Sequence, residues 1–137
     1  MVGARYLMDR QPASLTQAMV TAFMTEGHFA AHLRRMRVAY VQQRDALASE
    51  LIQQGDNIFD VTAMDQGLHL VTYMKGPTSD LRLEAAAPAK GVMVRAMSRL
   101  YLAGRPRQAL MLGFSGFPAE VIGPAAAKLI RIVAAEI

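Results

Sequence analysis

The chain has 137 residues and a mass of 14.9 kDa, about the length of one domain, and it contains no cysteine and no tryptophan. The absence of cysteine excludes disulfides, thiolate metal sites and cysteine nucleophiles. Hydrophobic residues make up 53% of the chain and charged residues only 19%, below the roughly 25% of typical soluble domains. We therefore expect a single domain, residues 1–137, with more apolar surface than it can bury alone.

The net charge of +4 comes from 15 lysines and arginines against 11 acidic residues. This value is ordinary for a soluble protein, so it is weak support for a nucleic-acid partner. Every apolar run is interrupted before the roughly 18 residues that a membrane span requires. The first residues also lack the apolar core of a secretory signal, so we expect a cytoplasmic protein without membrane contact.

Two helices are predicted for the N-terminal part. The first starts near Ser14, where Ser14 or Thr16 is a possible N-cap and Gln17 completes a capping box. Gly27 ends or bends it, and a long helix follows over about 28–54. Its predicted core stripe, stepped at 100° per residue, consists of Phe29, Leu33, Met36, Tyr40, Leu47 and Leu51.

After Gly55 the pattern changes to that of strands and short helices. The predicted strands are 59–64, 68–74, 92–97 and 109–115, with 65–67 as a hairpin link between the first two. Thr78, Ser79 and Asp80 resemble a cap for a helix over 81–87, and a last helix runs from Pro118 to Ile137. We expect an α+β fold, with a helical arm at about 14–54 and an α/β part at about 58–137 that holds a small, mostly antiparallel sheet of about four strands with helices packed on it.

Spacing alone identifies neither a metal site nor a catalytic site. His28 and His32 have helical zinc-ligand spacing, but Phe29 stands where a zinc hydrolase carries its glutamate, so we expect ordinary histidines and no metal. Ser115 lacks the glycine spacing of a nucleophile elbow, which leaves no predicted catalytic residue.

Arginines cluster in the long helix. Arg34 and Arg35 point away from the predicted apolar stripe, whereas Arg37 and Arg44 lie near its edge. We interpret Arg37 and Arg44 as candidates for ion pairs at an interface. No aromatic residue stands among them to stack on bases, so we expect no DNA binding by this segment.

One long pattern resembles a known family. It runs Gln17-Ala18, then Phe23-Met24-x-Glu26-Gly27-His28-Phe29-x-x-His32-Leu33-Arg34-Arg35-Met36-Arg37-x-x-Tyr40 and Arg44, with Gly67-Leu68-His69 and Leu110-Met111-Leu112-Gly113-Phe114-Ser115 downstream. This pattern is similar to the C-terminal part of MocR-type regulators of the GntR family, whose effector domain is aminotransferase-like, of fold type I. Plain aminotransferases share much of it.

The resemblance implies the small C-terminal subdomain of a protein that binds pyridoxal 5'-phosphate (PLP) and an amino-acid-like effector. The family holds its cofactor through a lysine upstream of this stretch, and Lys75, Lys90 and Lys128 do not match that motif. We therefore expect no cofactor-binding residue in this chain, which would form one wall of the cleft without catalysing or reading DNA. Its partners would be the rest of the parent chain or a second copy. The main alternative is the same subdomain of a genuine aminotransferase, and a third is a free-standing dimerising module that needs no cofactor.

One position departs from the family pattern. Many fold type I aminotransferases carry a carboxylate-binding arginine where this chain has Met111, and a thioether cannot make the same bidentate contact. The resemblance leaves two possibilities: Arg105 or Arg107 from the preceding loop binds the effector carboxylate, or the effector is not an α-amino acid.

Overall fold

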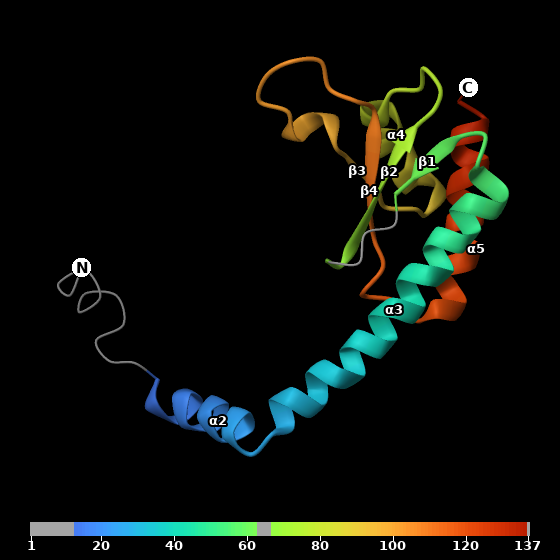
Figure 1. Ribbon diagram of the computed structural model, residues 1–137. Helices are drawn as coiled ribbons and strands as arrows, with labels where there is room; N and C mark the ends of the chain where they lie inside the picture. The colour runs from blue at the N-terminus through green and yellow to red at the C-terminus, as the bar shows by residue number, and fades with distance from the viewer. Residues whose placement is uncertain (1–12, 63–66, 137) are drawn as a thin grey trace. The chain divides into compact units, whose positions relative to one another are not determined.

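The computed structural model describes residues 13–62 and 67–136 (Figure 1). Two helices open the described part, α2 (Ser14–Thr25) and α3 (His28–Gly55), as predicted. The chain turns between them at Gly27, whose φ of +82° favours glycine. The predicted capping box is wrong: Ala13 is the N-cap residue and makes no side-chain cap, because Ser14 and Thr16 already lie within the helix.

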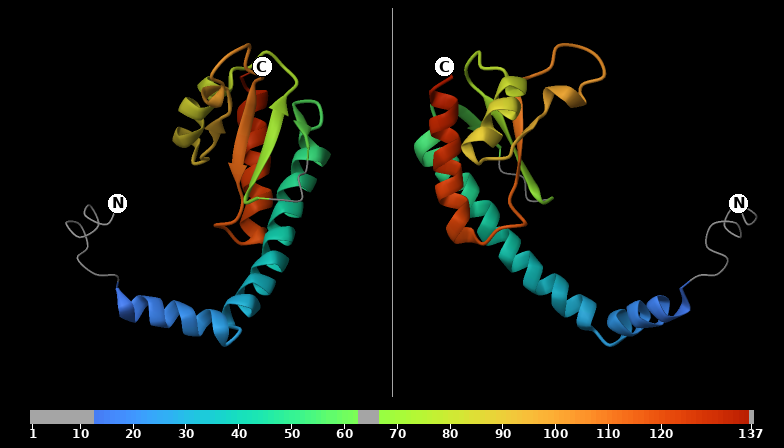
Figure 2. Two further views of the ribbon diagram at one scale, coloured as in Figure 1. Left: turned by 60° about the vertical axis from the view of Figure 1, so that its left-hand side comes forward. Right: turned by 180° about the vertical axis from the view of Figure 1, so that it is seen from behind.

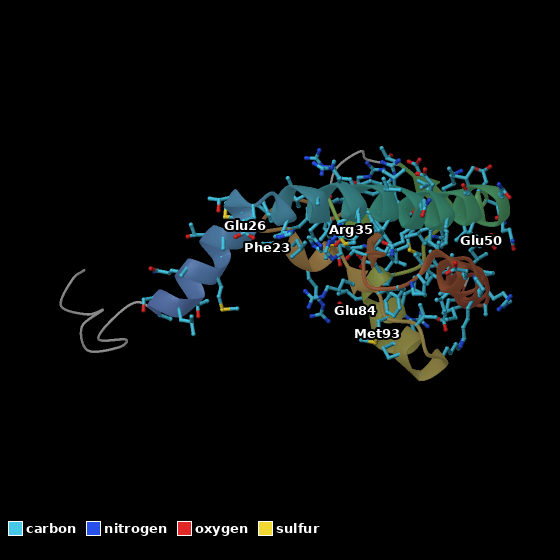
Figure 3. All side chains as sticks on the ribbon, turned by 90° about the horizontal axis from the view of Figure 1, so that it is seen from below. Phe23, Glu26, Arg35, Glu50, Glu84 and Met93 are labelled. Carbon is cyan, nitrogen blue, oxygen red and sulfur yellow. The ribbon has the colours of Figure 1, made fainter. Side chains whose placement is uncertain are left out.

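The described residues form two compact units, which divide inside α3 between residues 38 and 39. In the first unit α2 has no buried residue. The ring of Phe23, labelled in Figure 3, meets that of Phe29 edge to face at 6.1 Å. Of the predicted stripe in α3, Leu47 and Leu51 are buried, Met36 and Tyr40 are half-buried, and Phe29 and Leu33 are exposed.

The second unit contains a four-stranded sheet in the order β1-β2-β4-β3, and every neighbouring pair is antiparallel. Its strands are β1 (Phe59–Val61), β2 (His69–Met74), β3 (Arg95–Ala96) and β4 (Ala109–Gly113). Most of the predicted hairpin link lies outside the described residues. The third strand is shorter than predicted, because Val92 bonds back to Ala87 and Met97 already turns into a 3₁₀ helix.

Helices complete the α+β fold that the sequence predicts. They are α4 (Asp80–Ala86), α5 (Ala119–Ala134) and the 3₁₀ turns η1 (Ala87–Lys90) and η2 (Ser98–Leu100). In the views of Figures 1 and 2, α5 and the C-terminal part of α3 lie along one side of the sheet. None of the helices between residues 13 and 136 is both long and apolar enough to cross a membrane.

Alternation along the strands builds the core. Leu70 and Thr72 on β2 and Leu110 and Leu112 on β4 are buried, and the buried leucines join those of α3 and α5 in one cluster. Gly55 is the last residue of α3, and the surrounding core leaves little room for a side chain at this position. A Cβ at this glycine would lie 3.0 Å from Cδ2 of Phe59 and 3.2 Å from Cγ1 of Ile130.

Candidate functional site

The sheet presents a second face that is chemically different from the core face. The intervening strand residues point away from the core and, apart from the buried Ala109, are exposed or half-buried. We call this set the open face: Asp60, His69, Val71, Tyr73, Arg95, Met111 and Gly113. In the strand register, Met111 pairs with Val71 on one side and with Arg95 on the other.

Arg107 belongs to the same surface. Its guanidinium carbon lies 3.8 Å from the ring centroid of Tyr73, a cation–π geometry, and one of its nitrogens is 4.0 Å from a carboxylate oxygen of Asp60. Arg105, two residues earlier, is exposed in the loop before β4 and has no ion pair within the described segments. Of the two predicted carboxylate ligands, the fold brings Arg107 to the open face.

Arg95 is the residue that sequence reasoning missed. It lies directly opposite Met111, and paired residues of an antiparallel sheet point to the same face. Arg95 therefore presents a guanidinium beside the side chain of Met111. The sequence predicts both strands, 92–97 and 109–115, but not their register. Only the register places the side chains of Arg95 and Met111 next to each other.

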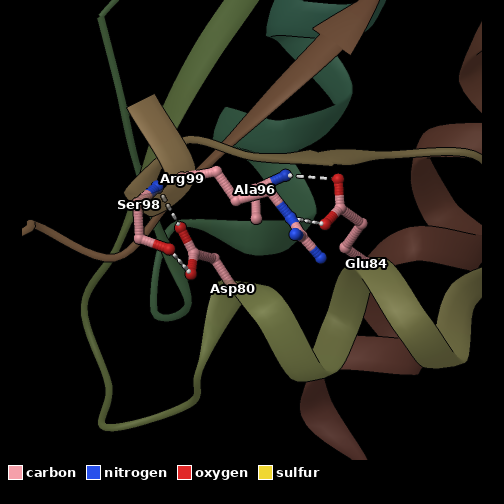
Figure 4. A network of polar contacts seen from close by, with 5 residues as sticks. All are labelled: Asp80, Glu84, Ala96, Ser98 and Arg99. Atoms are coloured by element: carbon pink, nitrogen blue, oxygen red, sulfur yellow. Dashed lines mark hydrogen bonds and ion pairs between the residues drawn. The ribbon is translucent and has the colours of Figure 1, made fainter. Parts of the chain in front are cut away.

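A cavity of about 480 Å³ lies at the β3 end of the open face. It is lined by residues of α4, β3, η2 and β4: Glu84, Ala85, Arg95, Ala96, Arg99, Leu100 and Met111. Glu84 accepts hydrogen bonds from Nε of Arg99 at 2.5 Å and from the backbone nitrogen of Ala96 at 3.3 Å (Figure 4). The hydrogen bond from Arg99 is the main cause that lowers the pKa of Glu84 below the ordinary glutamate value.

The wholly buried carboxylate of Asp80 holds the wall of this cavity in place. It accepts hydrogen bonds from the backbone nitrogen of Ser98 at 2.9 Å and from the hydroxyl of Ser98 at 2.6 Å (Figure 4). It also accepts one from the backbone nitrogen of Ala109 at 3.3 Å. The predicted cap is thus only partly right: Ser79 is the N-cap residue, without a side-chain bond, and Asp80 instead reaches across to the strands. Asp80 thereby fixes both ends of the segment that carries Arg99, Arg105 and Arg107.

A second cavity, of about 310 Å³, lies between α3, α5 and the segment before β3. Its lining contains no charged or polar side chain, so nothing in it could orient a polar ligand. Met93, labelled in Figure 3, lies in this lining and is 80% exposed. We regard this cavity as an extension of the core.

The two arginines predicted for an interface have different surroundings. Arg44 is paired with its neighbour Asp45, at 2.8 Å between nitrogen and oxygen. Arg37 is exposed and forms no ion pair with another residue of the described ranges. An interfacial role for either remains a prediction.

The lysines do not fit a covalent site for an aldehyde cofactor on the open face. Lys75 follows β2 and pairs with Asp56, its Nζ lying 3.1 Å from a carboxylate oxygen. Lys90 is exposed in η1, and Lys128 is exposed on α5. Within residues 13–62 and 67–136, the histidine and carboxylate side chains form no group of three or more that could hold a metal ion.

Two curated regulators are related to this chain in sequence, whereas no protein-family model matches it. The probable rhizopine catabolism regulatory protein MocR of Rhizobium meliloti is 31% identical over 105 residues, which are 77% of this chain and 21% of that protein. The uncharacterized HTH-type transcriptional regulator YhdI of Bacillus subtilis is 24% identical over 116 residues, or 85% of this chain and 25% of the relative. The chain therefore spans only a minor part of the length of both relatives.

Several aminotransferases are among the solved structures with the same fold. An archaeal alanine:glyoxylate aminotransferase superposes with a TM-score of 0.81 at 18% identity, over 96% of this chain and 33% of the enzyme. The α-aminoadipate aminotransferase of Thermus thermophilus, solved with N-(5'-phosphopyridoxyl)-L-leucine, also reaches 0.81, at 21% identity, over 98% of this chain and 34% of that one. At such identities the likeness shows the fold alone, and it confirms the expected aminotransferase-like architecture.

Proposed function

Because this chain is an aminotransferase-like domain related to the MocR-type regulators, we propose that it acts as the small C-terminal subdomain of a PLP-dependent transcriptional regulator. In this proposal, residues 1–137 form one domain, and the open face is one wall of the cleft for the cofactor and an amino-acid-like effector. The rest of the parent chain, or a second copy, would supply the opposite wall.

The observation that carries the proposal is the chemistry of the open face. It offers Arg95 and Arg107, a half-buried tyrosine and a methionine, which suit a small anionic ligand, but no lysine. Such a surface can orient a ligand that another domain binds covalently. PLP, when bound by that other domain, would supply the reactive aldehyde, and this chain would supply positioning contacts.

The relatives support a regulator rather than an enzyme, because both MocR and YhdI are named as regulatory proteins. The aminotransferase fold keeps the alternative open that the parent is a genuine aminotransferase. A regulator would have a DNA-binding domain in the same reading frame, whereas an aminotransferase would not.

The test is to read the genomic frame upstream of Met1 and to express the longest product. A winged helix-turn-helix and sequence-specific DNA binding by that product, with no turnover of amino acids, would support the regulator. Transaminase turnover without a DNA-binding domain would establish the alternative.

The 137-residue chain serves as the matched control. We expect it to bind DNA without sequence preference and to lose that binding near physiological salt, because only phosphate contacts are available to it. Tight, sequence-specific binding by this chain alone would contradict the proposal.

A further inference from the structure

The cavity at the β3 end of the open face has more positively charged than negatively charged side chains in its lining. Its lining holds two guanidinium groups, of Arg95 and Arg99, and one carboxylate, of Glu84. Arg99 and Glu84 neutralise each other through their direct ion pair. Arg95 forms no hydrogen bond or ion pair with another residue of the described segments, so the cavity retains one unpaired positive charge.

The remainder of the lining is apolar. Ala85, Ala96, Leu100 and Met111 contribute the other side chains, and the cavity volume of about 480 Å³ is within the range of small-molecule sites. A guanidinium at the edge of an apolar hollow matches a ligand with one anionic end and a hydrocarbon body.

From this arrangement we infer that the cavity binds a monocarboxylate with a short apolar body, and that Arg95 holds the carboxylate. All groups needed for this site lie within the chain, so the inference is independent of whether the parent protein is a regulator or an enzyme. It adds a ligand class and a binding residue to the open face.

Two related anions fit the cavity less well. The ammonium group of an α-amino acid would add a further positive charge beside Arg95 and Arg99, and Glu84, the only carboxylate in the lining, is already paired with Arg99. Inorganic phosphate at neutral pH is a mixture of monoanion and dianion with no apolar part, so it gains nothing from the apolar remainder of the lining. The cavity should therefore prefer a carboxylic acid that lacks the amino group.

The experiment is an NMR titration of the 137-residue chain with 4-methylpentanoate, with leucine and with inorganic phosphate. Leucine differs from 4-methylpentanoate by its amino group alone. We expect saturable shifts at the Arg95 Nε–H and the Met111 methyl with 4-methylpentanoate, and weaker or no saturation with the other two ligands.

Arg95→Gln should weaken binding of 4-methylpentanoate by about tenfold or more, since a charge-assisted bidentate contact is lost. Arg95→Lys should give an intermediate loss of affinity, because lysine keeps the positive charge but cannot make the bidentate hydrogen bonds of a guanidinium. Arg34→Gln is the matched control, since Arg34 is an exposed arginine of α3 outside the cavity lining, and this variant should bind as the unaltered chain does.

Unchanged spectra away from the cavity verify that the variants are folded. Equal or tighter binding of leucine or phosphate, or full affinity in Arg95→Gln, would overturn the inference. Neither result would alter the outcome of the reading-frame test, so the two proposals fail separately.

Discussion

Two hydrogen bonds join Asp80 to Ser98, one from the backbone nitrogen and one from the hydroxyl. Replacing Asp80 with alanine removes both bonds and also leaves the backbone nitrogen of Ala109 without its acceptor. We expect Asp80→Ala to lower the free energy of unfolding by about 2–4 kcal/mol, because buried donors are left unsatisfied.

Urea unfolding followed by circular dichroism measures this loss. Asp56→Ala is the control, since Asp56 is 82% exposed and pairs with Lys75 at the surface, where such pairs contribute about 0–1 kcal/mol. Equal losses in the two variants would show that the Asp80 contacts contribute no more than a surface pair.

Glycine substitutions in two helices should differ in their effect on stability. A Cβ at Gly55 would lie too close to Phe59 and Ile130 in the core, so Gly55→Ala should destabilise the protein by about 1–3 kcal/mol. Gly123 lies inside α5, and no residue other than its chain neighbours and the helix backbone comes within 4 Å of a built Cβ. Gly123→Ala should change the stability by less than about 0.5 kcal/mol, because the gain in helix propensity is offset by crowding against the following Pro124. Thermal unfolding of both variants tests the pair, and an equal loss in the two would contradict the packing described for Gly55.

The ion pair of Glu84 with Arg99 should be visible in a carboxyl titration. Arg99→Gln should raise the pKa of Glu84 toward the ordinary value, whereas Arg95→Gln should raise that pKa less, because Arg95 acts on Glu84 through its charge alone and without a hydrogen bond. Carbon-13 NMR of the Glu84 side chain measures both shifts, and Arg95→Gln is the matched control.

The lowered pKa of Glu84 also sets the direction of a stability change. A carboxylate with a depressed folded-state pKa stabilises the native state above the unfolded value, roughly 4.3, and this contribution disappears as the pH falls through the folded-state pKa. Glu84→Gln should therefore have a lower free energy of unfolding than the unaltered chain at neutral pH. In acid the free energies of unfolding of the two chains should become equal. A stability difference that grows on acidification would contradict the sign of the shift.

Mixed with stoichiometric PLP and treated with borohydride, the chain should give no lysine adduct specific to one site. Lys75 is engaged by Asp56, and Lys90 and Lys128 lie in η1 and α5 rather than on the open face. Peptide mass spectrometry at each lysine reads out the result. A quantitative adduct at one of these lysines would show that this chain holds the cofactor itself.

Periodicity was sufficient for most of the fold. The apolar spacing of α3, the turn residues after it and the short β-branched runs predicted the elements and their order, because each is a local pattern. The cap at Ser14 and the length of the third strand were predicted wrongly. Ser14 is already helical, and the strand is shortened by the turn in which Val92 donates to Ala87 and by the 3₁₀ helix that begins after Met97.

The site was less accessible from sequence. Arg107 could be proposed because it precedes a strand, but its stacking on Tyr73 and its approach to Asp60 join residues far apart in the chain. Arg95 could not be singled out, because its significance depends on the register that sets it opposite Met111. Asp80 looked like a capping residue, and only the packed structure reveals its three partners.

Since one buried carboxylate binds both Ser98 and Ala109, the loop 101–107 between them can be fully exposed and take no part in the core. Replacement, lengthening or shortening of 101–107 would leave Asp80 with the same three donors. Selection can therefore vary this loop, including Arg107 beside the open face, without first endangering the fold.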